Sequence, residues 1–230
     1  MSALAKLNFS TLLSATENIQ FENSSISSVS TIVLASNGIA LNQSLINSTA
    51  RSCKTNFGPG RGAVVQFNNS YCTSGSSSCG FGVLSNFTLC ENTVQYFLFL
   101  SHSFPYISKG PYLSTGSGGY GYNLNQDGRG AGGGIVFIYA GLNIVLEESI
   151  IEARGGNVNL QDELSAGSGG TIFVTSKNIT GVGRNIVAAS GGNSSNNKGA
   201  GGGGLVKISF VNSTETPPGS LFVNIYQGIQ

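Results

Sequence analysis

The stretch GRGAGGGIVFIYAG (Gly128–Gly141) joins a run of glycines directly to a run of strand-forming residues. The same arrangement recurs in SAGSGGTIFVTS (Ser165–Ser176) and in GAGGGGLVKISF (Gly199–Phe210). A glycine cluster followed at once by a hydrophobic run is unsuited to a flexible linker, because the hydrophobic run must be buried. Collagen is excluded as well, because glycine does not recur at every third position.

Two markers place these stretches in a repeat. Alignment on the last glycine before each hydrophobic run makes Gly134, Gly170 and Gly204 equivalent, at spacings of 36 and 34 residues. The sequences ARGGN and ASGGN end at Asn157 and Asn193, which are again 36 residues apart. Two markers with one spacing indicate a structural repeat rather than low complexity.

A weaker copy lies near the N-terminus, in STIVLASNGIALNQSLINSTA (Ser30–Ala50). It aligns with the hydrophobic residues after the first glycine cluster at an offset of 105, which places Ser44 opposite Ser149 and Ile46 opposite Ile151. This offset is close to three of the later units. The repeat is therefore expected to extend through most of the chain.

The short runs of Val, Ile, Leu, Phe and Thr between Gly, Asn and Ser turns predict an all-β fold. A unit of about 35 residues cannot cover its own apolar face, whereas stacked copies can, so we expect a parallel β-solenoid. The glycine clusters are predicted to form its corners, because glycine tolerates positive φ and lets backbones approach closely. One short helix is possible in SALAKLNFSTLL, with Leu4, Leu7 and Leu12 on one face.

The solenoid is expected to be one continuous domain in three parts. Residues 1–51 form N-terminal strands or a cap, residues 52–101 form a cysteine-containing insertion, and residues 102–230 form the glycine-rich coils. The end of the chain, GSLFVNIYQGIQ, predicts a strand with nothing after it to cover it.

Several glycine motifs carry a resemblance to a known family. These are GPGRG (Gly58–Gly62), GSGGYGYN (Gly116–Asn123), GAGGGIVFI (Gly130–Ile138) and AGSGGTIFV (Ala166–Val174), followed by SGGN. They resemble glycine-rich right-handed parallel β-helix proteins of the pectin-lyase-like type, in particular large secreted or cell-surface proteins of unicellular eukaryotes. The resemblance implies an extended extracellular scaffold, with the right-handed parallel β-helix as its fold. It implies no known active site.

Composition excludes some classes of protein. Charged residues are 9% of the chain and the net charge is +1 without a basic cluster, which argues against nucleic acid as a partner. The longest candidate for a membrane span, Val94–Leu100, is too short to cross a membrane. The N-terminus lacks the hydrophobic core of a secretory signal, so an extracellular protein with this sequence is expected to be a mature product or a fragment.

Asn-x-Ser/Thr acceptor triplets for N-glycosylation occur nine times. None lies between Asn92 and Lys177, where the glycine-rich strands are densest, as expected if glycans need exposed positions. The alternative is that an Asn-rich, Ser-rich chain contains such triplets by chance. The acceptor residues are Asn8, Asn23, Asn42, Asn47, Asn68, Asn86, Asn178, Asn193 and Asn212.

The four cysteines, Cys53, Cys72, Cys79 and Cys90, lie within one segment. Their spacing lacks the close pairs of a zinc site, so two disulfides and an oxidising compartment are expected. Three connectivities are possible, of which Cys53–Cys72 with Cys79–Cys90 is the simplest.

Carboxylates provide the strongest catalytic candidates. Glu148, Glu152 and Arg154 have the same parity on a strand and could share one face, as a polysaccharide-cleaving β-helix enzyme would require. The alternative, which we favour, is an ordinary solvent-facing side of one strand. Asp127 and Asp162 lie in glycine-bordered loops but lack the spacing of a calcium loop, so no metal or other cofactor is expected.

The remaining candidates are a lone histidine and a cluster of tyrosines. His102 has no nucleophile motif beside it and is expected to be structural. Exposed tyrosines can stack on sugar rings, although packing over flat glycine backbone is an equal alternative. The tyrosines are Tyr106, Tyr112, Tyr120 and Tyr122.

These observations predict a non-catalytic extracellular glycoprotein. Its expected partner is another copy of itself, because an uncapped solenoid end presents unpaired strand edges on which the next copy can stack into a filament or surface layer. Two alternatives stay open: a polysaccharide-active lyase or hydrolase, and a lectin-like module that binds surface glycans.

Overall fold

The computed structural model describes residues 10–54, 57, 58, 60–62, 64–67, 70–73, 115–120, 129–159, 165–194, 199–210 and 221–224. Within these residues the secondary structure consists of strands, without a helix. The strands are β1 (Ser10–Ala15), β2 (Asn18–Glu22), β3 (Ser25–Ser27), β4 (Ser30–Ala35), β5 (Gly38–Asn42), β6 (Leu45–Asn47), β7 (Val64–Phe67), β8 (Ser70–Thr73), β9 (Ile135–Ala140), β10 (Asn143–Glu147), β11 (Ile150–Glu152), β12 (Thr171–Ser176), β13 (Asn178–Val182), β14 (Asn185–Ala188), β15 (Leu205–Phe210) and β16 (Leu221–Asn224).

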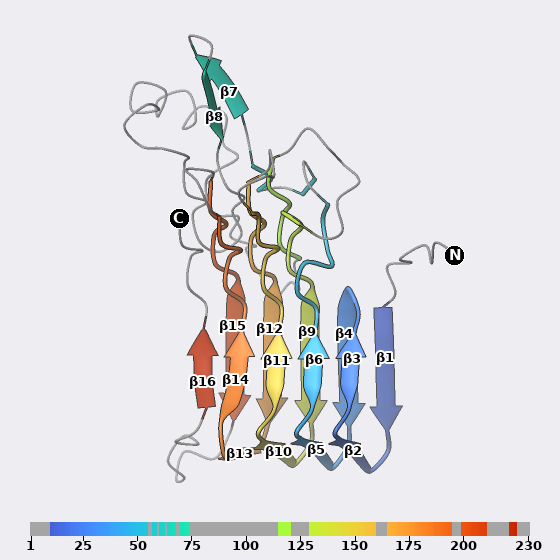
Figure 1. The fold of residues 1–230 in the computed structure, drawn as a ribbon. Helices are drawn as coiled ribbons and strands as arrows, with labels where there is room; N and C mark the ends of the chain where they lie inside the picture. Colours follow the sequence, from blue (N-terminus) through green and yellow to red (C-terminus); the bar gives the residue numbers. More distant parts are fainter. Residues whose placement is uncertain are drawn as a thin grey trace, which may run out of the picture.

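Three parallel sheets stack coil upon coil, as predicted for a β-solenoid (Figure 1). Sheet A has the order β1-β4-β9-β12-β15, sheet B the order β2-β5-β10-β13, and sheet C the order β3-β6-β11-β14-β16. Each coil gives one strand to each sheet: coil 1 is β1–β3, coil 2 is β4–β6, coil 3 is β9–β11 and coil 4 is β12–β14. Coil 5 gives β15 to sheet A and β16 to sheet C. The antiparallel pair β7–β8 lies outside the stack.

The internal repeat is confirmed, but the reading of its longest offset was wrong. Ser44 donates its backbone N–H to the hydroxyl of Ser149, and Ile46 pairs with Ile151, as the offset of 105 predicts. However, coil 2 pairs directly with coil 3, so this offset spans one coil plus an insertion (residues 48–134) rather than three units. A shorter repeat in coils 1 and 2, in which Ser10 pairs with Ser30, was missed.

The predicted N-terminal helix is wrong in the part that the structure describes. Leu12 lies in strand β1, which pairs along its whole length with β4. A helix this short is marginal in water, and parallel pairing with an existing coil provides the hydrogen bonds that it would otherwise make internally. Leu4 and Leu7 lie outside the described residues.

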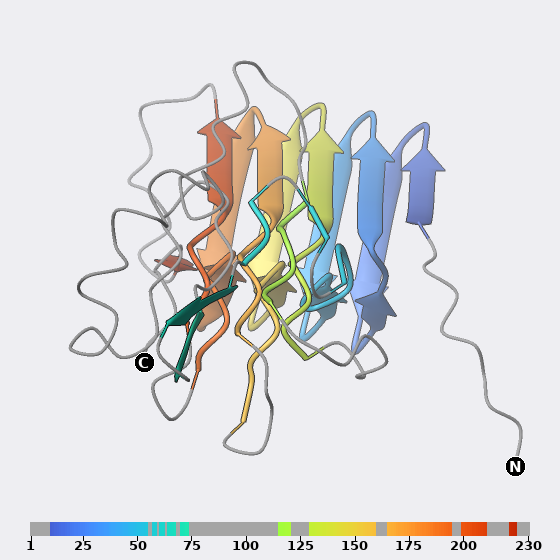
Figure 2. The same cartoon turned by 90° about the horizontal axis from the view of Figure 1, so that it is seen from above.

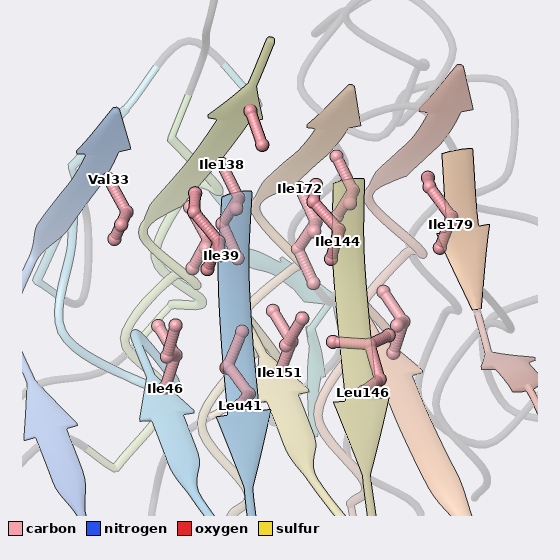
Figure 3. Packing of buried hydrophobic residues seen from close by; sticks show 14 of the residues in the cluster. Val33, Ile39, Leu41, Ile46, Ile138, Ile144, Leu146, Ile151, Ile172 and Ile179 are labelled. Atoms are coloured by element: carbon pink, nitrogen blue, oxygen red, sulfur yellow. The ribbon is translucent and has the colours of Figure 1, made fainter. Parts of the chain in front are cut away.

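The hydrophobic core fills the space between the three sheets (Figure 3). Inward side chains form rows along the stack because each coil repeats the one before it about 4.8 Å away. Val33 of sheet A, Ile144 of sheet B and Ile151 of sheet C are at most 1% exposed. Burial of a side chain of this size contributes roughly 1.5–3 kcal/mol. The repeated apolar rows are therefore the main stabilising element of the coils.

The corner between sheets B and C is formed by one residue in the left-handed conformation in each coil. These residues are Asn23 (φ 47°), Gln43 (φ 46°), Glu148 (φ 45°) and Gly183 (φ 68°). A polar column follows this corner, with Ser44 and Ser149 one residue after it and Asn185 two residues after it. The N–H of Ser44 donates to Ser149 Oγ, and the N–H of Ser149 donates to Asn185 Oδ1.

The glycine clusters lie beside the stack, on the connections from sheet C of one coil to sheet A of the next (Figure 1). Gly134, Gly170 and Gly204 lie one above another: the N–H of Thr171 donates to Gly134 O at 3.0 Å, and the N–H of Leu205 donates to Gly170 O at 2.9 Å. Their predicted stacking is therefore confirmed. We call the segments 115–120, 130–134, 153–157, 165–170, 188–193 and 199–204 together the glycine layer.

Positive φ, however, was the wrong reason for most of these glycines. Among the described residues, only Gly58, Gly130 and Gly183 are glycines with positive φ, and of these only Gly130 lies in the glycine layer. Close backbone approach is the main cause: a Cβ on Gly167 would overlap the carbonyl oxygen of Ala131, and a Cβ on Gly119 would overlap that of Ser165.

Hydrogen bonds in the glycine layer follow a period of three residues, as clearly seen in segment 165–170. Backbone N–H groups three residues apart donate to the same neighbouring segment, so this segment has neighbours in three directions. The donor and acceptor pairs are Ser165 with Tyr120, Ser168 with Ser117, Ala166 with Gly199, Gly169 with Gly202, Gly167 with Gly156, and Gly170 with Ala153. Three residues per turn is the geometry of the polyproline II helix, which makes no internal hydrogen bonds. The glycine layer is thus a bundle of such helices bonded to one another.

Candidate functional surfaces

The N-terminal end of the stack exposes part of its core. Leu13, Ile19 and Ile26 of coil 1 face inward but are only partly buried, whereas their counterparts in coil 2, Val33 and Ile39, are at most 2% exposed. Strands β1, β2 and β3 each pair with one strand of coil 2, and no described strand lies on their other side. This end therefore combines free strand edges with apolar side chains.

The C-terminal end has the same character. Val206 and Ile208 of coil 5 are partly buried against the core, and β15 pairs only with β12 among the described strands. The row Leu13–Val33–Ile138–Val174–Ile208 runs through the whole of sheet A in register. One row of apolar side chains thus ends half-covered at both ends of the described stack.

The outer surface of sheet A, which we call face A, is apolar across its middle. Its central row is Leu12, Ile32, Phe137, Phe173 and Lys207. The rings of Phe137 and Phe173 are 6.4 Å apart, and Lys207 Nζ lies 6.0 Å from the Phe173 ring. The five strands lie side by side in chain order (Figure 2).

The outer surface of sheet B, face B, is polar by contrast. It presents Gln20, Glu22 and Glu147, and the amide of Asn178 donates to Asn143 Oδ1 at 3.0 Å. All five described carboxylates lie off face A, on face B, on the outer side of sheet C or at corners. They are Glu17, Glu22, Glu147, Glu148 and Glu152.

The structure brings together two members of the catalytic candidate trio. Arg154 forms an ion pair with Glu152 at 2.8 Å. Glu148 instead occupies the corner before β11, where its carboxylate accepts a hydrogen bond from Gln43 Nε2 at 3.3 Å. The assumption that Glu148 has strand geometry was wrong, because its φ of 45° turns the chain there.

Most of the other candidates fall outside the described residues. Tyr120 is described, and its backbone pairs with Ser165 at the edge of the glycine layer. The described residues contain no group of three His, Cys, Asp or Glu side chains that could hold a metal ion. The candidates outside the described residues are His102, Asp127, Asp162, Tyr106, Tyr112 and Tyr122.

Cys53 is described with a free, half-buried thiol 3.7 Å from the hydroxyl of Thr115. The two disulfides stay predictions, because the side chains of the other three cysteines lie outside the described residues. Only the backbone of Cys72 is described, in β8. Cys79 and Cys90 lie outside the described residues.

Five of the nine glycosylation triplets have a described acceptor. Asn42 and Asn178 lie on face B, Asn23 lies at the corner beside it, and Asn47 lies on the outer side of sheet C. Asn193 is exposed beside the glycine layer. The other acceptors, Asn8, Asn68, Asn86 and Asn212, lie outside the described residues.

No protein family, characterised protein or solved structure matches the chain. In the part of the chain that the structure describes, no helix has the length and hydrophobicity needed to cross a membrane.

Proposed function

We propose that the protein is a non-catalytic extracellular structural glycoprotein whose copies stack end to end into a filament or surface layer. The observation that carries this proposal is the pair of half-covered core ends. Val206 and Ile208 of one copy match the inward positions of Thr11 and Leu13 in the row register of sheet A. A second copy stacked on coil 1 would extend these rows and pair the free edges of β1 and β3 with those of β15 and β16.

Backbone geometry also supports stacking. Coils 1 and 2 show that this chain can add a coil with three strands in register. An end-to-end contact would make the same kind of hydrogen bonds between copies. Unpaired strand edges beside apolar side chains are the usual origin of edge-to-edge association.

The glycoprotein and extracellular parts of the proposal rest on the acceptor triplets and on the resemblance to glycine-rich secreted β-helix proteins. Both are tested by the intact mass of secreted material before and after enzymatic removal of N-glycans. A mass equal to that of the bare chain would contradict them.

Stacking is tested with one substitution at each end. Ile19→Lys puts a charge on the inward side of coil 1, and Ile208→Lys does so in coil 5. The matched controls, Gln20→Lys and Ser209→Lys, add the same charge on the outward side of the same strands. Sedimentation velocity at micromolar concentration is expected to show large assemblies for the wild type and both controls, and single chains for both inward variants.

A mixture of the two inward variants gives the sharper result. Each variant keeps one intact end, so equal amounts are expected to form dimers and nothing larger. Circular dichroism verifies that each variant remains folded. Single chains in the wild type, or large assemblies in either inward variant, would overturn end-to-end stacking.

A further inference from the structure

We infer that stacked copies of this protein pair laterally through face A, which meets face A of a second copy. This inference rests on the proposed function, because it concerns the filament that end-to-end stacking would produce. It assigns a partner to the apolar outer surface of sheet A, and it predicts two-stranded filaments in place of single ones.

The first argument is the chemistry of face A. Leu12, which is 64% exposed, lies in one row with Ile32, Phe137 and Phe173. Tyr139, in the next row, is 44% exposed. Face A has no carboxylate and a single cation, Lys207. An apolar surface of this kind is typical of an interaction site. Because it has almost no charge, two copies can meet face to face without repulsion.

The second argument is the position of the glycosylation triplets. None of the five described acceptors lies on face A: they lie on face B, at its corner, on the outer side of sheet C and beside the glycine layer. N-glycans on any of them would cover the other surfaces of the stack and leave face A open. The apolar face A thus carries none of the acceptors that the structure describes.

The third argument is area, and it explains why pairing requires the filament. Five strands about 4.8 Å apart and six residues long, at about 3.3 Å each, make a patch of about 500 Å². Two such patches bury about 1,000 Å² in total, at the lower limit for a specific interface. End-to-end stacking joins the patches into a continuous stripe, so contacts that are weak singly act together.

The experiment compares charge substitutions on faces A and B of coil 3. Tyr139→Glu adds a carboxylate on face A, in the middle strand of sheet A. Val145→Glu, at a side chain 39% exposed on face B, is the matched control. Electron microscopy is expected to show paired filaments for the wild type and Val145→Glu, and single filaments of similar length for Tyr139→Glu. Mixing Tyr139→Glu with Tyr139→Lys chains is expected to restore pairing.

The outcomes separate the two proposals. Single filaments in the wild type, or paired filaments in Tyr139→Glu, would overturn lateral pairing through face A while leaving end-to-end stacking intact. Chains that form no filament at any concentration would overturn stacking itself, and lateral pairing with it.

Discussion

The coils and the glycine layer are two solutions to the burial of backbone in one chain. In the coils, strands pair in ladders and apolar side chains such as Ile144 fill the space between the sheets. In the glycine layer, backbone packs directly on backbone, and a central segment such as 165–170 bonds to neighbours in three directions. The first arrangement derives its stability from side chains. The second requires that there be almost none.

This difference predicts opposite responses to the size of a side chain. Core positions in the coils are destabilised when a side chain becomes smaller, because a cavity remains. Positions in the glycine layer are destabilised when a side chain becomes larger. The added Cβ would overlap a backbone carbonyl oxygen of a neighbouring segment, and hydrogen bonds to several other segments prevent that backbone from moving. Four substitutions test the contrast, given from the largest expected effect to the smallest.

Gly167→Ala is expected to have the largest effect. Its Cβ would overlap the carbonyl of Ala131, and neither backbone can move without breaking hydrogen bonds. The expected loss is about 3 kcal/mol or more, at the upper end of overpacking costs. Soluble yield and the thermal melt by circular dichroism measure it. The neighbouring Ala166→Gly, which only removes a methyl, should cost about 1 kcal/mol, and equal losses in the two variants would contradict the account of the glycine layer.

Ile144→Ala tests the coils by the opposite change. Ile144 is fully buried in sheet B, so truncation is expected to lower the free energy of unfolding by about 3 kcal/mol through lost burial and a residual cavity. Denaturant titration measures this change. The adjacent Val145→Ala on face B should shift stability by less than about 0.5 kcal/mol; a comparable shift would mean that the two faces of β10 are not distinguished by burial.

Asn185→Ala tests whether the polar column also stabilises the coils. Asn185 is fully buried, accepts from the N–H of Ser149 and donates to the carbonyls of Leu146 and Val182. Its loss leaves these groups unpaired, with an expected cost of about 2 kcal/mol. The control is Asn143→Ala, an exposed position with one hydrogen bond to Asn178. Chemical denaturation measures the free energy of unfolding of both variants. Equal losses would mean that the polar column does not stabilise the coils.

Ala50→Gly should have the smallest effect and the opposite sign. Ala50 has a φ of 52°, a conformation that costs a residue with a Cβ roughly 1–2 kcal/mol. Glycine removes that cost but loses more entropy on folding, so a net gain of up to about 1 kcal/mol is expected. Ala40→Gly, within strand β5, should instead lower stability. The midpoint of thermal unfolding is expected to rise for Ala50→Gly and to fall for Ala40→Gly. A lower midpoint for Ala50→Gly would contradict this prediction.

Much of this architecture could be predicted from the sequence. The stacking of Gly134 on Gly170 and the pairing of Ile46 with Ile151 both followed from spacing, because a solenoid keeps equivalent residues in register. The corner at Glu148 was not predicted, because a left-handed glutamate has no strong local signal. The period-three bonding of the glycine layer was also hidden, since a run of glycines is compatible with turns as well as with polyproline II helices.

The candidate surfaces were less accessible to sequence analysis. Which side chains are half-covered at the N-terminal end of the core depends on where the first coil begins, and part of coil 1 was wrongly predicted to be a helix. Strands such as Ile135–Ala140 give a hint of face A, because the residues on both sides of the strand are apolar. Alternation alone does not show which set faces outward, because that depends on the position of the other two sheets.

The insertion between coils 2 and 3 gives the stack one joint unlike the others. Coils 1 and 2 pair across 20 residues of sequence, whereas coils 2 and 3 pair across 105. Closing the longer loop costs about 1.5 kcal/mol more in chain entropy, although the strands that meet are of equal length. Under tension along its axis, the stack should part at this joint first. Residues 48–114, which precede the glycine-layer segments bonded to segment 165–170, would then extend by up to roughly 220 Å, so the joint would yield while the coils on both sides stay folded.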